Sequence, residues 1–382
     1  MGFPQVWLAV IVLKKLFPAA FLVALLLASG LFLVNRNPEL PPCENNVTYS
    51  LSPDVNGSLG VLVVYMDPGI SHERAETVFD AARDVGAKWV RIGFIWAIAE
   101  PSPGEYNFTE FDWIINAALQ RNLLVLPVVM FTPRWASERP DARNYYLYPP
   151  SNPEYLREFA RALAAHYRGR VTHWELWNEP DMAGFLNDPD GDGSTADDYA
   201  EMLAHFYRGI KEGNPSAKVV LGGLANSKAE PSCEGNYLRK LLSDPEFPAG
   251  RNFDVMNVHT NFRNPWEIVE KMREIRTVLQ EFGLEKPIWV TETSYTPVKR
   301  FQILPCYRGE EGFERYVHDA LVVELNEGAE VAFWAALHDY GGDRPESDPY
   351  KYSGLYTYDL KPKGAAEVFR NLSEELAVNG SR

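Results

Sequence analysis

The sequence predicts a (β/α)8 barrel, an α/β fold in which eight parallel strands form a closed barrel inside a ring of helices. Short apolar runs alternate eight times with longer amphipathic stretches, starting at residue 59. The runs are nearly continuous in Val, Ile and Leu, as is typical of parallel strands buried on both faces. A doubly wound open sheet is disfavoured because no Gly-rich phosphate-binding turn follows the first run. The predicted strands are Leu59–Tyr65, Trp89–Phe94, Leu123–Met130, Val171–Trp177, Val219–Leu224, Val255–His259, Ile288–Thr291 and Val331–Ala336.

The stretches between the runs have the periodicity of helices with one buried face. Within His72–Val85, apolar residues recur at spacings of three and four, which predicts a helix. Ser151 and Glu154 have the spacing of a capping box, and predict a helix that continues through Tyr155–Tyr167. Further helices are expected over Trp266–Phe282 and from near Gly364 to beyond Asn371.

The N-terminus differs from the rest of the chain. Leu16–Val34 has 19 residues without a charge and follows Lys14 and Lys15. A spanning helix needs roughly 18 or more apolar residues and a signal-peptide core about 7–15, so an uncleaved anchor is favoured over a cleaved signal. Lysines before the segment direct the larger part of the chain outward. We therefore expect a membrane anchor or signal over 1–34, a Pro-rich tether over 35–58 and the barrel over 59–382. The protein would be secreted or held at the extracellular face.

The charge balance excludes one class of partner. The chain of 382 residues carries 37 Lys and Arg against 52 Asp and Glu, with a formal net charge of −15. Nucleic-acid binding depends on clusters of Lys and Arg, and no such cluster is present, so no nucleic-acid partner is expected. The three cysteines are Cys43, Cys233 and Cys306, which permit one disulfide. Cys233 and Cys306 follow the fifth and seventh runs, at the same end of the barrel, and are the pair we expect.

Two glutamates follow strand ends, where this fold carries its catalytic groups. The fourth run leads into Asn178 and Glu179, and the seventh into Glu292. Glycoside hydrolysis needs such a pair, one carboxylic acid for the leaving oxygen and one carboxylate for the anomeric carbon. A separation of about 5–5.5 Å gives retention through a covalent intermediate. We expect Glu175, which alternation directs into the barrel, to be a structural partner of Arg91.

These motifs resemble the clan A glycoside hydrolases, a barrel group that includes families 5, 39, 42 and 51. The resemblance rests on Trp-Asn-Glu-Pro at 177–180 and Thr-Glu at 291–292, and it extends over nearly the whole chain after residue 58. It implies that Glu179 is the acid/base, that Glu292 is the nucleophile and that Asn178 binds the sugar hydroxyl beside the cleaved bond. It also implies that Arg91 braces the nucleophile.

The resemblance implies further residues of the substrate site. His259, at the end of the sixth run, matches a histidine of that site, and Trp334, at the end of the eighth, matches a tryptophan that floors it. Stretches around Trp96 and Trp135 also match, and both rings are expected to contact sugar. Family 5 has a His-x-Tyr motif on the sixth strand, whose tyrosine donates a hydrogen bond to the nucleophile. Here the motif is His-Thr-Asn at 259–261, so Tyr295 or Tyr340 is expected to take that place, and a family 39-like assignment is equally compatible.

The expected function is therefore a retaining glycosidase without a cofactor, acting on O-glycosidic, β-linked bonds of an oligo- or polysaccharide by double displacement. A carbohydrate-binding pseudoenzyme and a transglycosylase are the alternatives, and retention of both glutamates disfavours the first. No metal site is predicted. Asp188–Ser194 has the aspartates and glycine of a calcium loop, but Tyr199 replaces the glutamate that would complete it, which favours an acidic turn before a helix.

Overall fold

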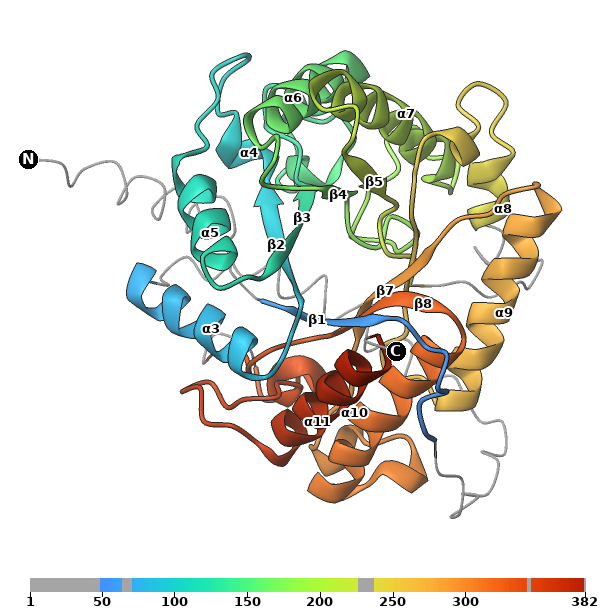
Figure 1. Ribbon diagram of the computed structural model, residues 1–382. Helices are drawn as coiled ribbons and strands as arrows, with labels where there is room; N and C mark the ends of the chain where they lie inside the picture. Colours follow the sequence, from blue (N-terminus) through green and yellow to red (C-terminus); the bar gives the residue numbers. More distant parts are fainter. Residues whose placement is uncertain (1–48, 64–70, 226–236, 342–344, 381–382) are drawn as a thin grey trace, which may run out of the picture.

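Eight parallel strands form a barrel in the computed structural model, which describes residues 49–63, 71–225, 237–341 and 345–380 (Figure 1). The order β5-β4-β3-β2-β1-β8-β7-β6 leaves β5 and β6 at the two ends of the sheet. Two isolated parallel bridges, Val220 to Val255 and Leu224 to Val258, join them and close the barrel. The predicted (β/α)8 fold is confirmed. The strands are β1 (Ser58–Leu62), β2 (Trp89–Ile95), β3 (Leu124–Met130), β4 (His173–Leu176), β5 (Lys218–Val220), β6 (Met256–His259), β7 (Ile288–Thr293) and β8 (Ala329–Trp334).

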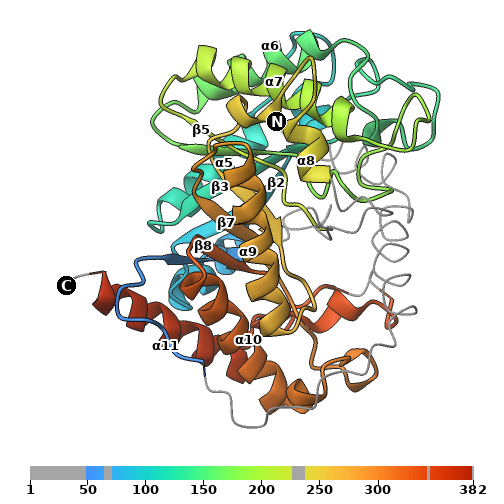
Figure 2. The ribbon, with the colours of Figure 1, turned by 90° about the vertical axis from the view of Figure 1, so that its right-hand side faces the viewer.

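Helices cover the outside of the barrel. In both ribbon views α6 and α7 lie on one side of the strands, and α10 and α11 on the opposite side (Figures 1 and 2). The α-helices are α3 (His72–Asp84), α4 (Trp96–Ala99), α5 (Thr109–Leu119), α6 (Pro153–His166), α7 (Ala196–Gly213), α8 (Tyr237–Leu242), α9 (Pro265–Glu281), α10 (Gly309–Asn326) and α11 (Gly364–Asn379). Short 3-10 turns lie at η1 (Tyr145–Leu147), η3 (Ala249–Arg251), η4 (Lys299–Phe301), η5 (Pro305–Tyr307) and η6 (Pro349–Tyr352).

The start of α6 differs from the prediction. Asn152, not Ser151, caps the helix, and its side chain accepts a hydrogen bond from the backbone N–H of Glu154. Pro153 occupies the first helical position, where a missing N–H costs no hydrogen bond and the fixed φ suits the helix. The hydroxyl of Ser151 instead donates to the carbonyl of Ala136, so the predicted capping box is wrong.

Side-chain alternation along the strands divides the protein interior into two regions. Side chains that point outward form the main core with the helices. Those that point inward at the amino-terminal ends of the strands form a second apolar cluster of Trp89, Leu126, Val220, Val255, Trp289, Val331 and Phe333. Nearer the carboxyl ends the inward positions become polar, with Arg91, Glu175 and Asn257 all buried. The apolar cluster thus forms a floor beneath a polar barrel mouth.

The predicted N-terminal segments fall largely outside the described residues. This applies to the anchor or signal over 1–34 and to the first part of the tether, and no helix among the described residues is long and apolar enough to cross a membrane. The last part of the tether is docked on α10, because Asn326 accepts a hydrogen bond from the Ser52 N–H and donates one to the Ser50 carbonyl. Cys306 is disulfide-bonded, and its predicted partner Cys233 lies outside the described residues.

Candidate active site

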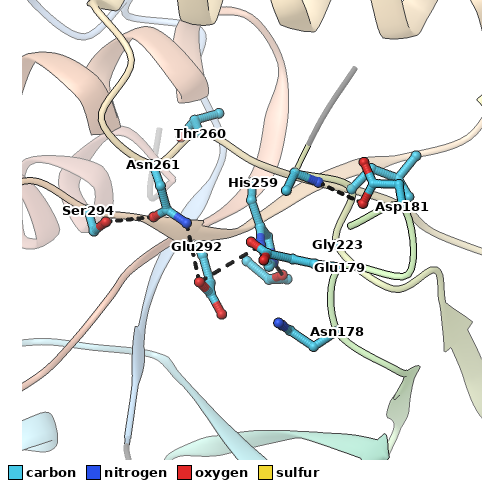
Figure 3. A network of polar contacts seen from close by, with 12 residues as sticks. Asn178, Glu179, Asp181, Gly223, His259, Thr260, Asn261, Glu292 and Ser294 are labelled. Carbon is cyan, nitrogen blue, oxygen red and sulfur yellow. Dashed lines mark hydrogen bonds and ion pairs between the residues drawn. The ribbon is translucent and has the colours of Figure 1, made fainter. Parts of the chain in front are cut away.

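The chain turns sharply where β4 ends, and this turn brings Glu179 to the barrel mouth. Trp177 and Glu179 both have left-handed backbones, with φ of 66° and 45°. Each such residue costs about 1 kcal/mol or more relative to an ordinary conformation, and strained residues of this kind cluster at functional sites. The indole N–H of Trp177 donates to the carbonyl of Phe185 at 2.9 Å and holds its ring in the protein interior. The strained turn therefore places Asn178 and Glu179 toward the site (Figure 3).

Glu179 and Glu292 face each other across the barrel mouth, with His259 beside them (Figure 3). One carboxylate oxygen of Glu179, one of Glu292 and a ring nitrogen of His259 all lie within 4.8 Å of one another. His259 Nδ1 is 2.8 Å from Glu179 Oε1 and 3.8 Å from Glu292 Oε2, and Nε2 is 3.1 Å from the hydroxyl of Thr291. A Cβ on Gly223 would lie 2.0 Å from His259 Nε2, so only glycine allows the ring to pack here.

Arg91 connects the two sides of the site from below. Its guanidinium, 2% exposed, donates to Glu292 Oε1 at 2.7 Å and to Asn178 Oδ1 at 2.7 Å. It also makes a bidentate pair with Glu175, both bonds at 2.8 Å, which confirms the expected structural role of that glutamate. Asn257 donates to the same Glu175 carboxylate at 3.1 Å. One buried cation thus fixes the nucleophile candidate and the amide beside the acid/base candidate.

The surroundings of Glu292 favour its ionised form. Burial of the carboxyl acts to raise its pKa, but the charges of His259 and Arg91 and the hydrogen bonds from Arg91 and Asn261 outweigh burial and hold the pKa below its usual value. Glu292 is therefore a carboxylate at neutral pH. An ionised carboxylate beside a second carboxyl group is the arrangement that displacement at an anomeric carbon requires.

Known proteins resemble the chain in both sequence and fold. Residues 65–144 match the family model described as beta-galactosidase of glycoside hydrolase family 42. A beta-xylosidase of Geobacillus stearothermophilus is 22% identical over 217 residues, which are 50% of this chain and 42% of that protein. A family 39 glycoside hydrolase from Bacteroides cellulosilyticus WH2 superposes with a TM-score of 0.63 at 20% identity, over 85% of this chain and 66% of that one. The exo-beta-1,4-mannosidase of Opitutaceae bacterium strain TAV5 gives 0.64 at 18% identity, over 87% and 63%.

The chain is therefore similar in sequence to glycoside hydrolases over part of its length, and its fold is that of TIM-barrel enzymes of families 39 and 5. The resemblance inferred from the strand-end motifs is thereby confirmed. The chain spans less than half the length of the curated beta-xylosidase that it matches.

Asn261 stands where the family 5 motif has a tyrosine, and like Arg91 it donates a hydrogen bond to the nucleophile candidate Glu292. Its amide Nδ2 is 3.3 Å from Glu292 Oε2, and its Oδ1 accepts from the hydroxyl of Ser294 at 2.7 Å. Neither residue was predicted from the sequence. Asn261 occupies the third position of the His-x-Tyr motif, so the signal was the position itself, at which an amide can donate as a phenol does.

Tyr295 does not take the place of that tyrosine. Its side chain is fully buried, its ring stacks on Tyr316 of α10 at 4.4 Å, and its hydroxyl accepts from the Leu304 N–H at 3.2 Å. Tyr340 lies in the loop after β8, where its backbone N–H donates a hydrogen bond to the carbonyl of Lys351. A third tyrosine, Tyr350, lies in η6, and burial, followed by the charges of Glu179 and Glu292, raises the pKa of its phenol well above the usual value.

The ring of Trp334 points away from the barrel interior. Inward and outward positions alternate on β8, so Phe333 faces the barrel interior and Trp334 faces α10, where its ring packs on Phe313 and Tyr316. Trp334 is 0% exposed, and its indole N–H donates to the Ser353 carbonyl at 2.8 Å. A fully enclosed ring has no free face for a sugar, so the prediction that Trp334 floors the site is wrong.

Trp96 and Trp135 pack against α6. Trp96 is 1% exposed, stacks on Phe159 and donates to the Glu100 carboxylate at 2.7 Å. Trp135 lies edge-on to Trp96 and donates to the Glu100 carbonyl at 3.0 Å. Both rings are thus held by the packing of the loops after β2 and β3 against α6.

Among the described residues, two groups of side chains have the spacing of metal ligands. The first is Glu179, His259 and Glu292, but the Arg91 cation, 2.7 Å from Glu292, opposes a second cation there. The second is Asp188, Asp190 and Asp192, which are largely exposed. The carboxylate of Asp188 accepts from the backbone N–H groups of residues 190, 191 and 193, as in the predicted acidic turn before α7.

Proposed function

We propose that the chain is a retaining β-glycosidase in which Glu292 is the nucleophile and Glu179 the acid/base. The observation that carries this proposal is that one carboxylate oxygen of Glu179 lies within 4.8 Å of one carboxylate oxygen of Glu292. Retaining glycosidases hold their carboxyl groups about 5–5.5 Å apart, whereas inverting ones need about 6.5–9.5 Å to admit a water molecule. The spacing therefore supports direct attack by Glu292 on the sugar.

In the first step a carboxylate oxygen of Glu292 forms a bond to the anomeric carbon, and the glycosidic C–O bond breaks. Glu179 gives its proton to the leaving oxygen, so that the aglycone departs as a neutral alcohol. Arg91 holds the other oxygen of Glu292, at 2.7 Å, and keeps the carboxylate in one orientation during the attack.

In the second step water replaces the aglycone. Glu179, now ionised, takes a proton from the water, the water oxygen bonds to the anomeric carbon, and the bond to Glu292 breaks. The charge of Glu292 is masked in the glycosyl-enzyme, so the carboxylate of Glu179 no longer faces a second negative charge. Two inversions at one carbon return the original β configuration.

Asn178 is suited to bind the sugar. Its Oδ1 accepts from Arg91 at 2.7 Å, which fixes the amide plane and leaves Nδ2 available to donate to a substrate hydroxyl. His259 touches both carboxylates and orients Glu179 through a hydrogen bond of 2.8 Å. We assign Asn178 to substrate binding, and His259 to positioning of the acid/base.

The substrate class that we propose is a β-linked oligo- or polysaccharide. The relatives include proteins named beta-xylosidase, exo-beta-1,4-mannosidase and, for the family model, beta-galactosidase. These names share the β-linkage and differ in the sugar. A panel of sugars is therefore the appropriate first test.

The test is covalent trapping with activated 2-deoxy-2-fluoro β-glycosides of xylose, glucose, galactose and mannose, followed by peptide mapping. The proposal expects one sugar to inactivate the protein by labelling Glu292, and the first product of the unmodified glycoside to have the β configuration by NMR. A label on another residue, or an α first product, would refute the mechanism. No label with any of the four sugars, together with sugar binding by calorimetry, would support a pseudoenzyme. Label on Glu292 with transfer to an added sugar instead of water would identify a transglycosylase.

We also propose that residues 1–34 carry the catalytic barrel out of the cytosol. The 19 uncharged residues of Leu16–Val34, preceded by two lysines, support an anchor that faces outward. Alkaline extraction of membranes containing the full chain tests the anchor, and protease added to intact cells tests its orientation. Release of the full-length chain by alkaline extraction would contradict the anchor.

A further inference from the structure

The two oxygens of the Glu292 carboxylate have different surroundings. Oε1 accepts a hydrogen bond of 2.7 Å from the Arg91 guanidinium, a charge-assisted contact in a buried position. Among the described residues, Oε2 accepts a longer bond of 3.3 Å from the amide of Asn261, and it lies 3.8 Å from His259 Nδ1. Oε2 is therefore the less engaged oxygen, and it lies nearer to the histidine that contacts Glu179 (Figure 3).

The orientation of the Asn261 amide is fixed by its two partners. A carboxylate oxygen can only accept hydrogen bonds, so the amide nitrogen must face Glu292. Oδ1 then faces Ser294, whose hydroxyl donates to it at 2.7 Å. Ser294 is fully buried and lies two residues beyond Glu292, just past the end of β7. The chain segment that carries the nucleophile thus also carries the residue that orients the donor to the nucleophile.

Backbone hydrogen bonds fix Asn261 from both sides. The N–H of Thr260 donates to the carbonyl of Glu292 at 2.8 Å, and the N–H of Phe262 donates to the carbonyl of Ser294 at 2.9 Å. The pairing of β6 with β7 therefore continues past the last residue of β6. Phe262 has a left-handed backbone, with φ of 56°, which bends the chain away directly after Asn261. Asn261 consequently has little freedom to leave Glu292.

We propose that Asn261, oriented by Ser294, is a positioning residue that directs Oε2 of Glu292 toward the anomeric carbon as the attacking oxygen. This inference rests on the proposed glycosidase function. When Oε2 forms the bond to the sugar, the amide of Asn261 keeps the carboxylate plane in line while Arg91 retains Oε1. An amide does not ionise as a phenol does near pH 10, so this donor persists throughout the alkaline range.

The kinetic test is a double-mutant cycle of N261A, S294A and N261A/S294A. The readout is the rate constant for labelling of Glu292 by the 2-fluoro β-glycoside that traps the unmodified protein. N261A is expected to slow labelling by about 10- to 100-fold, the order of loss from a slightly misplaced reacting group, and S294A by less. The double variant should react no more slowly than N261A, because Ser294 acts through Asn261. Ser243→Ala, which alters an exposed serine directly after α8 and outside the site, is the matched control.

Labelling by N261A at the rate of the unmodified protein would overturn the inference while leaving the proposed function intact. Losses that multiply in the double variant would also overturn it, because they would mean that Ser294 acts on its own.

A second cycle needs no substrate and separates this inference from the proposed function. N261D places a carboxylate where the amide now contacts Glu292, and two like charges at that distance oppose joint ionisation. Arg91, His259 and Glu179 also face Glu292, and they are unchanged in every variant. As the pH rises from about 4 to about 7, the thermal midpoint of N261D should therefore fall more than that of the unmodified protein. In the double variant N261D/E292Q, compared with E292Q alone, this extra fall should be absent.

An equal fall in both backgrounds would show that residue 261 does not act on Glu292, and it would overturn the inference whatever the trapping experiment gives. If no sugar labels the protein but the extra fall depends on Glu292, the proposed function fails and the contact stands.

Discussion

Replacement of Glu324 by Gln should make the protein more stable, and increasingly so as the pH rises toward neutrality. Glu324 lies on α10, is 0% exposed, and accepts hydrogen bonds of 2.6 Å from the hydroxyls of Thr260 and Thr293 through Oε1. Its Oε2 is buried without a hydrogen-bond partner in the described part of the chain. Burial raises the pKa of this carboxyl to about 8 from an ordinary value of 4.5.

The magnitude follows from that pKa. Between about pH 4.5 and about pH 8 the carboxyl is protonated in the folded chain and ionised in the unfolded chain, so the folded state binds one more proton. Raising the pH then favours unfolding by about 1.4 kcal/mol for each pH unit. The contribution of Glu324 to stability is greatest below pH 4.5, declines through neutrality and levels off above pH 8. By pH 7 the loss is about 3 kcal/mol, and Gln, which has no proton to release, avoids it.

The assay is urea denaturation of the unmodified protein and of E324Q at several values from about pH 4.5 to about pH 8. The difference in free energy of unfolding should grow in favour of E324Q along the series. Glu311→Gln, which removes an exposed carboxyl from the same helix, is the control for loss of a negative charge. A difference between E324Q and the unmodified protein that stays constant with pH would refute the reasoning, because it would show that Glu324 is equally ionised in both states.

Three further predictions concern the acid/base, the barrel closure and the misplaced tryptophan. Glu179→Ala should slow hydrolysis of unactivated β-glycosides by about 10²- to 10⁴-fold, and azide should restore turnover of dinitrophenyl glycosides and yield a β-glycosyl azide; the absence of rescue would contradict the role of Glu179. Lys271 of α9 donates to the carbonyls of Leu224, Ala225 and His259 at 2.6–3.0 Å. Lys271→Met leaves these carbonyls without that donor and should lower the free energy of unfolding by about 3 kcal/mol; an unchanged urea midpoint would contradict this. Trp334→Phe should destabilise the protein by about 2 kcal/mol and leave KM unchanged, whereas a raised KM with unchanged stability would restore Trp334 to the sugar site.

The sequence predicted those parts of the fold and site that depend on position along a strand. Apolar runs identify the strands, and residues directly after a run lie at the barrel mouth, so position along the chain was enough to place Glu179 and Glu292 together. Arg91 lies within the second run, and its place beside Glu292 was implied by the family resemblance. Boundaries were less certain: the fifth strand was predicted over Val219–Leu224, whereas β5 ends at Val220. Beyond Val220 only Leu224, which follows Gly222 and Gly223, makes an isolated bridge to β6 in the described chain, so the continuous ladder ends early.

Side-chain direction and contributions from helices were not predictable. A shift of one residue on β8 decides whether a ring faces sugar or a helix, and Trp334 lies on the helix side. Glu324 of α10 bonds to Thr260 and Thr293, and Lys271 of α9 bonds to the carbonyl of His259. Helical periodicity shows which positions are buried, but not which of them contacts residues next to the site. The role of Asn261 was not predictable from the family motif, because the chain makes with an amide the contact that a tyrosine makes at the same position in family 5.

The junction between β5 and β6 has a bearing on the stereochemistry of the reaction. Glu179, the proposed acid/base, follows β4, and Glu292, the proposed nucleophile, lies near the end of β7, so the two carboxyl groups lie on opposite sides of this junction. Only about 1 Å separates the widest carboxyl spacing that gives retention from the narrowest that gives inversion. In the described chain two bridges and the ammonium group of Lys271 hold the junction closed. In the proposed mechanism, widening the barrel there would admit a water molecule between the carboxyl groups, so the configuration of the product would depend on residues that never touch the sugar.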